Sequence, residues 1–304
     1  MRYFQTVASC GSYSRGSELL HISQPAISRA IRKLEDELGT SLFKRHGHGV
    51  SLTESGKTLL SRGQSILRQL DQARQEVRAG RTSPAGTISL AMPPAAGHIL
   101  VPPLIEAFGT AYPNVTVNVV GGFSSTIHEW LVRGRVDVAC AHDPLPQRGF
   151  QMIPLLDEEV FLVGKKGAFP FRRAYARPED LSTLPLIAPG ELNASRRMLD
   201  RWAADKRLQL QLKVQVDDHF ITRALLRQGT GFTLLTRAGS QPELRLGELE
   251  ARPFRPRAFW TLTLMAGAQA ARSELLDAFM RTIRSVTRQL ADSGNWKGSI
   301  LSRE

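Results

Sequence analysis

The feature that most constrains this chain is a pair of short helical patterns with a tight break between them near the N-terminus. The first pattern runs from Ser14 to Leu20 and the second from Gln24 to Leu38, so only three residues separate them. Apolar residues recur in the second pattern at intervals of three and four, which predicts one stripe that must pack inward. The stripe consists of Ile27, Ile31, Leu34 and Leu38. Two helices joined so closely favour a helix-turn-helix.

The opposite face of the second helix carries hydrogen-bonding and cationic side chains, namely Gln24, Ser28, Arg29, Arg32 and Lys33. A helix fits the DNA major groove, where glutamine and arginine can read base edges while serine and lysine more often contact phosphates. Ser23 is a suitable N-cap, and Pro25 falls in the first turn, where its missing N–H costs nothing. We therefore predict that this face, including Ser23 and Pro25, binds DNA.

Residues 42–52 follow a C-capping Gly39 and predict two short strands around a glycine-rich tip, a wing. Arg45 is the wing residue best suited to a phosphate or minor-groove contact. Residues 1–86 hold 13 basic and 7 acidic side chains, which favours a polyanionic partner, although a solubilising surface would carry the same charge. His46 and His48 could suggest a metal site, but no third ligand accompanies them, so solvated histidines are favoured.

A long helix without proline is predicted from Glu54 to about Ala79. Its apolar residues are spaced by four and three, as in a heptad seam: Leu59, Gly63, Ile66, Leu70, Ala73 and Val77. A helix of about 26 residues is roughly 39 Å long, too long to leave such a stripe exposed. We expect it to pair with a second copy through Leu59, Ile66, Leu70, Ala73 and Val77. The alternative is that the stripe packs on the chain's own C-terminal domain. Residues 80–86 are polar and rich in breakers, as in a hinge.

After the hinge the pattern changes to alternating strands and helices. A first group has strands at 87–92, 115–121 and 136–141 and helices at 98–111 and 124–133. A second group has strands at 186–189, 212–217 and 232–236 and helices at 193–207 and 219–228. Apolar strands at 159–164 and 260–266 can cross between the groups and return a last helix, 273–290, to the first. The sequence therefore predicts two α/β lobes, followed by a frayed tail from Ala291 to Glu304.

Five motifs in the first 56 residues together resemble the DNA-binding domain of LysR-type transcriptional regulators. They are Gly11-Ser12-Tyr13-Ser14-Arg15, Leu20-His21-Ile22-Ser23-Gln24-Pro25-Ala26-Ile27-Ser28, Leu34-Glu35-Asp36-Glu37-Leu38-Gly39, Leu42-Phe43-Lys44-Arg45 and Leu52-Thr53-Glu54-Ser55-Gly56. Looser matches follow at Pro102-Pro103-Leu104, Tyr112-Pro113, Gly134-Arg135-Val136-Asp137 and Gly229-Thr230-Gly231. The chain departs from the family in a short first helix and at Gly16, where alanine is usual.

The resemblance implies the architecture of the whole chain. It implies a winged helix-turn-helix domain (1–58), a dimerisation helix with hinge (59–86) and a two-lobed α/β effector domain (87–304) resembling type 2 periplasmic binding proteins. Lobe I would span about 87–160 and 267–290, and lobe II about 161–266. The implied function is sequence-specific regulation of transcription, modulated by a small-molecule effector bound between the lobes. The implied partners are double-stranded promoter DNA, RNA polymerase and further copies in a homodimer or homotetramer.

The effector should lie outside the carboxyl ends of the strands, between the lobes. Ser124, Ser125 and Thr126 begin one helix, whose free N–H groups favour an anion, and Asn193 and Ser195 open the corresponding helix of the second lobe. Each could instead serve only as a cap. We expect five further residues at this site: Ala95 and Ala96 in the loop after the first strand, and His142, His219 and Thr236 near strand ends. The histidines could equally be surface or packing residues.

The sequence lacks the motifs of the enzyme classes that compete with a regulator. No GxSxG, HExxH, Walker A or complete GxGxxG follows a strand, so an α/β enzyme with an appended DNA-binding domain is less favoured, and no cofactor is expected. A constitutive regulator without effector is the other alternative. Cys10 and Cys140 lie far apart, which indicates structural thiols. The N-terminus lacks the order of a signal peptide and no stretch of about 18 apolar residues occurs, so we expect a cytoplasmic protein without a membrane partner.

Overall fold

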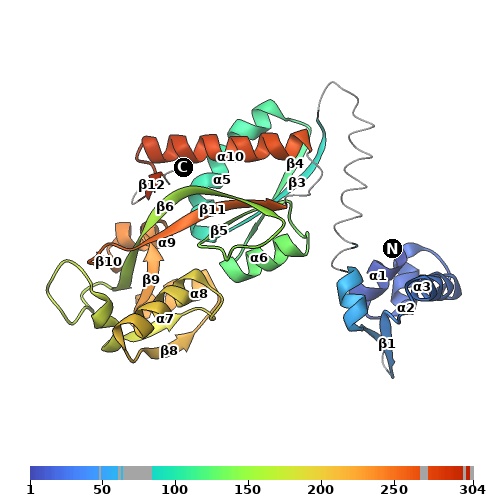
Figure 1. Ribbon diagram of the computed structural model, residues 1–304, viewed down its shortest axis with the longest axis horizontal. Coiled ribbons are helices and arrows are strands. Elements are labelled where there is room, and N and C mark those ends of the chain that lie inside the picture. Colours follow the sequence, from blue (N-terminus) through green and yellow to red (C-terminus); the bar gives the residue numbers. More distant parts are fainter. Residues whose placement is uncertain (48, 61–62, 64–83, 268–272, 297–298, 302–304) are drawn as a thin grey trace. The chain divides into compact units, whose positions relative to one another are not determined.

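A computed structural model describes residues 1–47, 49–60, 63, 84–267, 273–296 and 299–301 of the chain (Figure 1). The chain forms two compact units, one within residues 1–80 and the other made of nearly all of residues 81–304. Among the described residues, no helix combines the length and apolarity needed to cross a bilayer.

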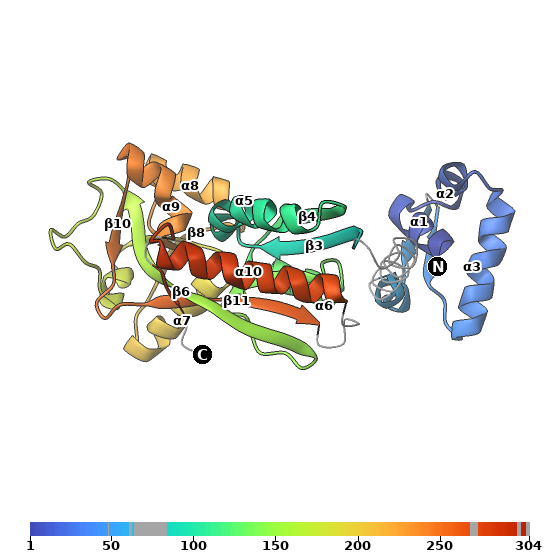
Figure 2. The ribbon, with the colours of Figure 1, turned by 90° about the horizontal axis from the view of Figure 1, so that it is seen from above.

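The described part of the first unit contains three complete helices, a hairpin and a helical segment at residues 54–60. The helices are α1 (Arg2–Cys10), α2 (Tyr13–Leu20) and α3 (Gln24–Leu38), and the hairpin pairs β1 (Phe43–His46) with β2 (Gly49–Leu52) (Figure 2). Phe4, Val7, Ile27, Ile31, Leu42 and Phe43 form their common core. Of the predicted stripe on α3, Ile27 and Ile31 are buried and Leu34 is partly buried, but Leu38 is 48% exposed. The prediction that Leu38 packs inward is therefore wrong, because α3 ends there and Gly39 turns the chain away.

Close backbone contacts fix the position of the hairpin. Val50 N–H donates to the Gly11 carbonyl at 2.9 Å, and a Cβ at Gly49 would lie 2.4 Å from that same oxygen. Glu35 on α3 accepts a hydrogen bond from Leu42 N–H at 2.7 Å. The hairpin is thus attached both to the turn after α1 and to the helix predicted to bind DNA.

Gly56 provides a test of this packing, since a Cβ there would lie 2.1 Å from the Leu42 carbonyl oxygen. We expect Gly56→Ala to destabilise the first unit by about 1–3 kcal/mol, because the backbone must move to relieve the overlap. Chemical denaturation followed by circular dichroism measures the change. Gly47→Ala is the control, since nothing lies within 4 Å of its Cβ position. Equal stability of the two variants would contradict the packing described here.

The second unit is built on an eight-stranded sheet. Its strands follow the order β10-β6-β11-β5-β3-β4, and β9 and β12 also pair with β6. Their bounds are β3 (Gly86–Met92), β4 (Val115–Gly121), β5 (Val138–His142), β6 (Phe150–Lys165), β9 (Thr233–Thr236), β10 (Leu249–Pro253), β11 (Phe259–Gly267) and β12 (Ser299–Leu301). Strands β7 (Pro185–Ala188) and β8 (Gln211–Gln215) form a separate parallel pair.

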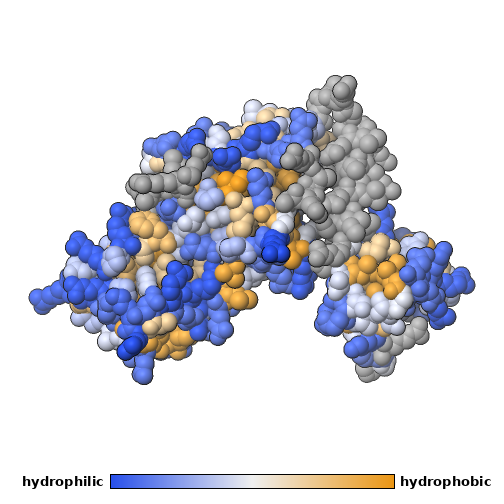
Figure 3. All heavy atoms as spheres, in the orientation of Figure 1, coloured by the Kyte–Doolittle hydropathy of each residue, from blue (hydrophilic) through white to orange (hydrophobic). Residues whose placement is uncertain are grey.

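Helices cover both faces of the sheet and complete two lobes. They are α5 (Pro94–Ala111), α6 (Ser124–Val132), α7 (Ala194–Lys206), α8 (His219–Gln228), α9 (Arg237–Leu246) and α10 (Glu274–Asp292), with a 3₁₀ turn, η2, at Pro178–Ser182. In the first lobe α5 and α10 pack side by side on one face of the sheet and α6 lies on the other. Hydrophilic side chains cover most of the face of the second lobe that Figure 3 displays.

Each lobe has its own hydrophobic core, and β6 belongs to both. Leu155 and Leu156 pack in the first core with Phe108 and Phe279, whereas Val160 and Leu162 pack in the second. The predicted crossing strand at 159–164 is thus the end of a 16-residue strand. Strand β11 crosses in the same way, with Trp260 in the second core and Leu262 in the first. The predicted alternation of strands and helices is present in both lobes.

Two predictions about this unit are wrong. Helix α5 begins at Pro94, not at His98, so Ala95 and Ala96 lie in its first turn instead of in a loop. Proline at a helix start loses no hydrogen bond, which explains why the helix tolerates it. The C-terminal tail is not frayed where the structure describes it, because Trp296 is 1% exposed and residues 299–301 pair with β6. Burial of one large aromatic side chain outweighs the polar composition around it.

Candidate functional site

The solvent face of α3 has the character expected from the sequence. Ser28 is half-buried, and the other residues of the predicted face are exposed: Ser23, Gln24, Pro25, Arg29, Arg32 and Lys33. Ser23 occupies the N-cap position without a side-chain capping bond. Within the described part of the chain, no carboxylate forms an ion pair with the three cations of this face. The face therefore offers uncompensated positive charge beside an amide and hydroxyls.

The wing extends from this unit as the β1–β2 hairpin. Arg45 lies opposite Val50 in the strand register, and its side chain lies outside the described residues. Nε2 of His46 is 2.5 Å from Oγ of Ser51, so this imidazole is engaged within the hairpin. Over the described ranges, no group of three or more His, Cys, Asp or Glu residues could hold a metal ion.

The predicted dimerisation seam is only partly within the described residues. Residues 54–60 are helical, and Leu59 is partly buried against the core of the first unit. Ile66, Leu70, Ala73 and Val77 lie outside the described residues. Leu59 thus contacts its own domain, and the pairing of the remaining seam stays a prediction.

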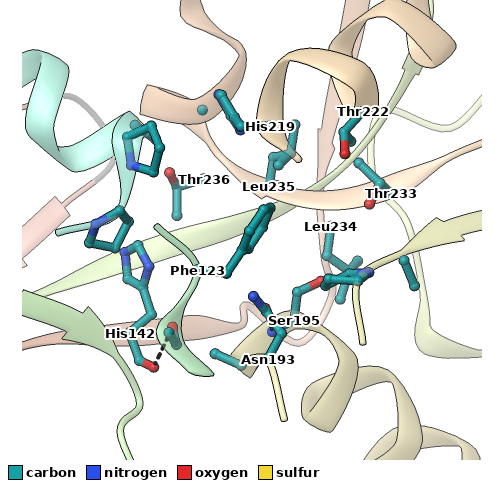
Figure 4. Close-up of a pocket in the computed structure, with 18 of the residues that line it drawn as sticks. Phe123, His142, Asn193, Ser195, His219, Thr222, Thr233, Leu234, Leu235 and Thr236 are labelled. Carbon is teal, nitrogen blue, oxygen red and sulfur yellow. Dashed lines mark hydrogen bonds between the residues drawn. The ribbon is translucent and has the colours of Figure 1, made fainter. Parts of the chain in front are cut away.

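A cavity of about 710 Å³, including its open mouth, lies between the two lobes (Figure 4). Seven of the ten residues predicted to bind an effector line it, namely Ala95, Ser124, His142, Asn193, Ser195, His219 and Thr236. Ala96 is instead fully buried in the core of the first lobe, and Ser125 and Thr126 lie on α6 outside the lining. The structure therefore brings together residues that are up to 141 positions apart in the chain, from Ala95 to Thr236.

Several lining residues were missed by the sequence analysis. They include Pro93, Phe123, Thr222, Thr233, Leu234 and Trp260. Trp260 carried a usable signal, because a tryptophan in a predicted core strand must place its indole N–H against an acceptor. The prolines and aliphatic residues carried none, since the same residue types fill any core.

The cavity wall is mostly apolar and contains no lysine, arginine, aspartate or glutamate. Burial, followed by the positive charge of Arg223, lowers the pKa of His219, so this imidazole is neutral at neutral pH. Nε2 of His142 lies 2.6 Å from Oε2 of Glu158 behind the wall. The wall of the cavity therefore carries no positive charge from an arginine or lysine side chain.

Two polar atoms at the wall are buried without a hydrogen bond in the described part of the chain. They are Oγ of Ser195 and Nε1 of Trp260, in residues that are 7% and 5% exposed. Ser195 lies in the first turn of α7, where Asn193 Oδ1 accepts a hydrogen bond from its N–H at 2.9 Å. A buried donor without an acceptor costs roughly 1–3 kcal/mol, so both atoms mark positions at which a bound molecule would be stabilised.

Other polar groups near the cavity have internal partners. The hydroxyl of Ser124 donates to the carbonyl of His142 at 3.4 Å, so it is not free to cap a ligand. Arg197 on α7 donates to the carbonyls of Leu192 and Asp143, and the second of these belongs to the first lobe. Arg197 therefore connects the two lobes, and its side chain does not line the cavity.

The buried cysteine of the first lobe, Cys140, is not a candidate nucleophile. Burial raises the pKa of its thiol to about 12, so this thiol is unreactive at neutral pH.

Comparison with known proteins matches both units. Residues 1–57 match the family model "Bacterial regulatory helix-turn-helix protein, lysR family", and residues 81–288 match "LysR substrate binding domain". The chain belongs to the LysR family of transcriptional regulators. It is 30% identical over 299 residues to the HTH-type transcriptional regulator BbuR of Bordetella bronchiseptica, an alignment that covers 98% of this chain and 92% of that protein.

Further relatives and solved structures agree with this assignment. The nitrogen assimilation regulatory protein nac of Escherichia coli is 26% identical over 79% of this chain and 78% of its own. A full-length OxyR variant from Pseudomonas aeruginosa has the same fold, with a TM-score of 0.71 at 24% identity, covering 100% and 97% of the two chains. CbnR, a LysR family regulator, gives a TM-score of 0.69 at 19% identity, covering 94% and 97%.

The predicted fold class and function are thus confirmed. This LysR-type regulator is a DNA-binding transcription regulator and not an enzyme, and it combines a helix-turn-helix with a two-lobed domain of the kind that binds small-molecule effectors. The matched helix-turn-helix model identifies the first unit as its DNA-binding domain.

His219 gives a pH-dependent prediction. The folded chain lowers the pKa of His219 below its ordinary value of 6.5, so just below this pH the unfolded chain binds a proton at His219 that the folded chain does not bind. Stability should therefore be present above about pH 6.5 and be lost as the pH falls below it. Chemical denaturation at about pH 7.5 and about pH 5.5 measures this loss, and His219→Gln should reduce it. An equal loss of stability in both proteins would show that His219 takes up its proton as readily folded as unfolded.

Proposed function

We propose that homodimers paired through residues 59–77 place two α3 helices in successive major grooves of a pseudo-palindromic site. The observation that supports this is the exposed face of α3, with three cations lacking carboxylate partners among the described residues. Gln24, Arg29 and Arg32 would read base edges, Ser23, Ser28 and Lys33 would contact phosphates, and Arg45 would contact the backbone from the wing. Pro25 fixes the first turn of α3. The boundaries of the three segments are those predicted from the sequence.

Replacement of Arg32 tests the interface. We expect Arg32→Ala to weaken binding to a genomic fragment selected by the wild-type protein by about 1–3 kcal/mol, because a base contact is lost, and to reduce the slope of log affinity against log salt by up to about 1, because one cation leaves the interface. Fluorescence anisotropy at several salt concentrations provides both values. Lys57→Ala is a matched control, because Nζ of Lys57 is already paired with Glu54 at 2.6 Å. Unchanged affinity and slope for Arg32→Ala would remove this residue from the interface.

The inter-lobe cavity is proposed to bind the effector, a small carboxylic acid with a largely apolar body. The acid oxygens would accept hydrogen bonds from Ser195 Oγ and Trp260 Nε1, the two buried donors without partners. Ser195 lies at the N-terminal end of α7, where the helix dipole also favours a negative charge. Ala95, Asn193, His142, His219 and Thr236 would surround the body of the molecule. An anionic effector is thus held by neutral donors instead of by an arginine or lysine side chain.

Removal of either donor tests this assignment. We expect Ser195→Ala and Trp260→Phe each to lower the affinity for a bound acid by about five- to tenfold, since one hydrogen bond contributes roughly 1 kcal/mol. A panel of aromatic and aliphatic carboxylic acids, screened by thermal shift and titrated by calorimetry, supplies the ligand. Ser293→Ala is the control, because this exposed hydroxyl bonds only the Leu290 carbonyl in the described chain. No binding by any acid would favour the constitutive regulator.

Effector binding would favour one arrangement of the lobes and so change how the protein bends DNA or contacts RNA polymerase. The size of the response is limited by the difference in effector affinity between the two arrangements. Assembly of two dimers into a homotetramer through the sensor domains would place four α3 helices on one promoter. Such a protein acts in the cytoplasm, where bacterial promoter DNA lies.

A further inference from the structure

Three buried side chains connect the effector pocket to the C-terminal segment. His142 lines the cavity, and its Nε2 lies 2.6 Å from Oε2 of Glu158. The other carboxylate oxygen of Glu158, Oε1, lies 3.0 Å from Nε1 of Trp296. Glu158 and Trp296 are each 1% exposed, and His142 is 8% exposed. A buried carboxylate is costly unless donors satisfy it, and these two rings supply the donors.

The indole determines the direction of one of these two hydrogen bonds. Nε1–H of tryptophan can only donate, so Oε1 of Glu158 accepts. A carboxylate offers acceptors alone, so in the arrangement proposed below Nε2 of His142 carries the hydrogen shared with Oε2. Trp296 is held in place from both sides, because its backbone N–H donates to the Leu290 carbonyl at 3.0 Å and Ser299 pairs with Glu158 in the β12–β6 register.

We propose that Glu158 and Trp296 are positioning residues that hold His142 as its Nε2–H tautomer, so that Nδ1 offers a lone pair to the molecule in the pocket. This inference rests on the proposed effector site. Ser195 and Trp260 then donate to the effector, while His142, whose ring centroid lies 5.7 Å from that of Trp260, accepts from it. The effector class that fits is a carboxylic acid that also carries a hydrogen-bond donor, such as a hydroxy acid.

Glutamine at position 158 tests the assignment without a change of size. In E158Q the amide carbonyl must face Trp296, because two N–H groups cannot hydrogen-bond each other. The amide NH₂ is left to donate to Nε2 of His142, which moves the ring hydrogen to Nδ1. We expect nitrogen NMR of the full chain labelled with ¹⁵N-histidine to show Nε2–H in the wild type and Nδ1–H in E158Q. Spectra are recorded at about pH 8.5, above the ordinary imidazole pKa, and His142→Gln assigns the signal.

A double variant separates the role of Trp296 from that of Glu158. In E158Q/W296F the indole donor is absent, so the amide can rotate and its carbonyl can accept from Nε2. We expect the Nε2–H tautomer to return. Glu159→Gln is the matched control, since Glu159 neighbours Glu158 on β6 and is 7% exposed, but its carboxylate is bound by Arg257 at 2.6 and 2.7 Å. This variant should keep the wild-type tautomer.

The tautomer is measured without any effector, so a wrong tautomer assignment can be distinguished from a wrong assignment of the effector pocket. Hydrogen on Nδ1 in the wild type, hydrogen on both nitrogens, or an unchanged ring in E158Q would overturn the assignment. Mandelate and phenylacetate, which differ by one hydroxyl, then probe the consequence for binding. E158Q should weaken mandelate binding about tenfold and leave phenylacetate binding within about twofold, as loss of one donor–acceptor match predicts. An equal change for both acids would contradict the proposed role of Nδ1.

Discussion

Strand β6 runs through both hydrophobic cores of the sensor domain, and the arrangement of the two lobes depends on it. Its residues at 155–156 pack in one core and those at 160–162 in the other, while β9, β10, β11 and β12 all pair with it. The lobes cannot separate without breaking these ladders, so relative motion is confined to bending near the crossing. An effector bound beside the crossing is well placed to bias that bending.

The cavity between the lobes has an apolar wall that buries polar atoms without giving them hydrogen-bond partners. Apolar residues from both lobes exclude water from its wall, yet Trp260 and Ser195 keep polar atoms there without internal partners. Such atoms lower the stability of the empty domain, and a bound molecule that hydrogen-bonds them would raise it. Arg197 on α7 donates a hydrogen bond to the carbonyl of Asp143 in the first lobe, so movement of α7 toward a ligand would displace or break this contact between the lobes.

The order of most helices and strands and the exposed cationic face of α3 could be predicted from the sequence, because helix periodicity and caps are local properties, whereas α9 and β10 were not predicted. The start of α5 could not, since Pro93-Pro94 looks like a break although proline is tolerated in a first helical turn. The C-terminal segment was predicted to be frayed because its composition is polar, and Trp296 alone reverses that outcome. Trp260 was missed because its place at the cavity depends on the packing of two distant lobes.

The central claim is that this protein binds specific DNA and responds to a small molecule held between its lobes. Sequencing of genomic fragments bound by the purified protein, with and without a pool of cellular metabolites at near-physiological salt, tests it most directly. The account predicts pseudo-palindromic sites whose footprints change with the pool in the wild type but not when Ser195 and Trp260 are both replaced. Salt-sensitive binding without a preferred sequence, or footprints that change equally in the variant, would contradict it.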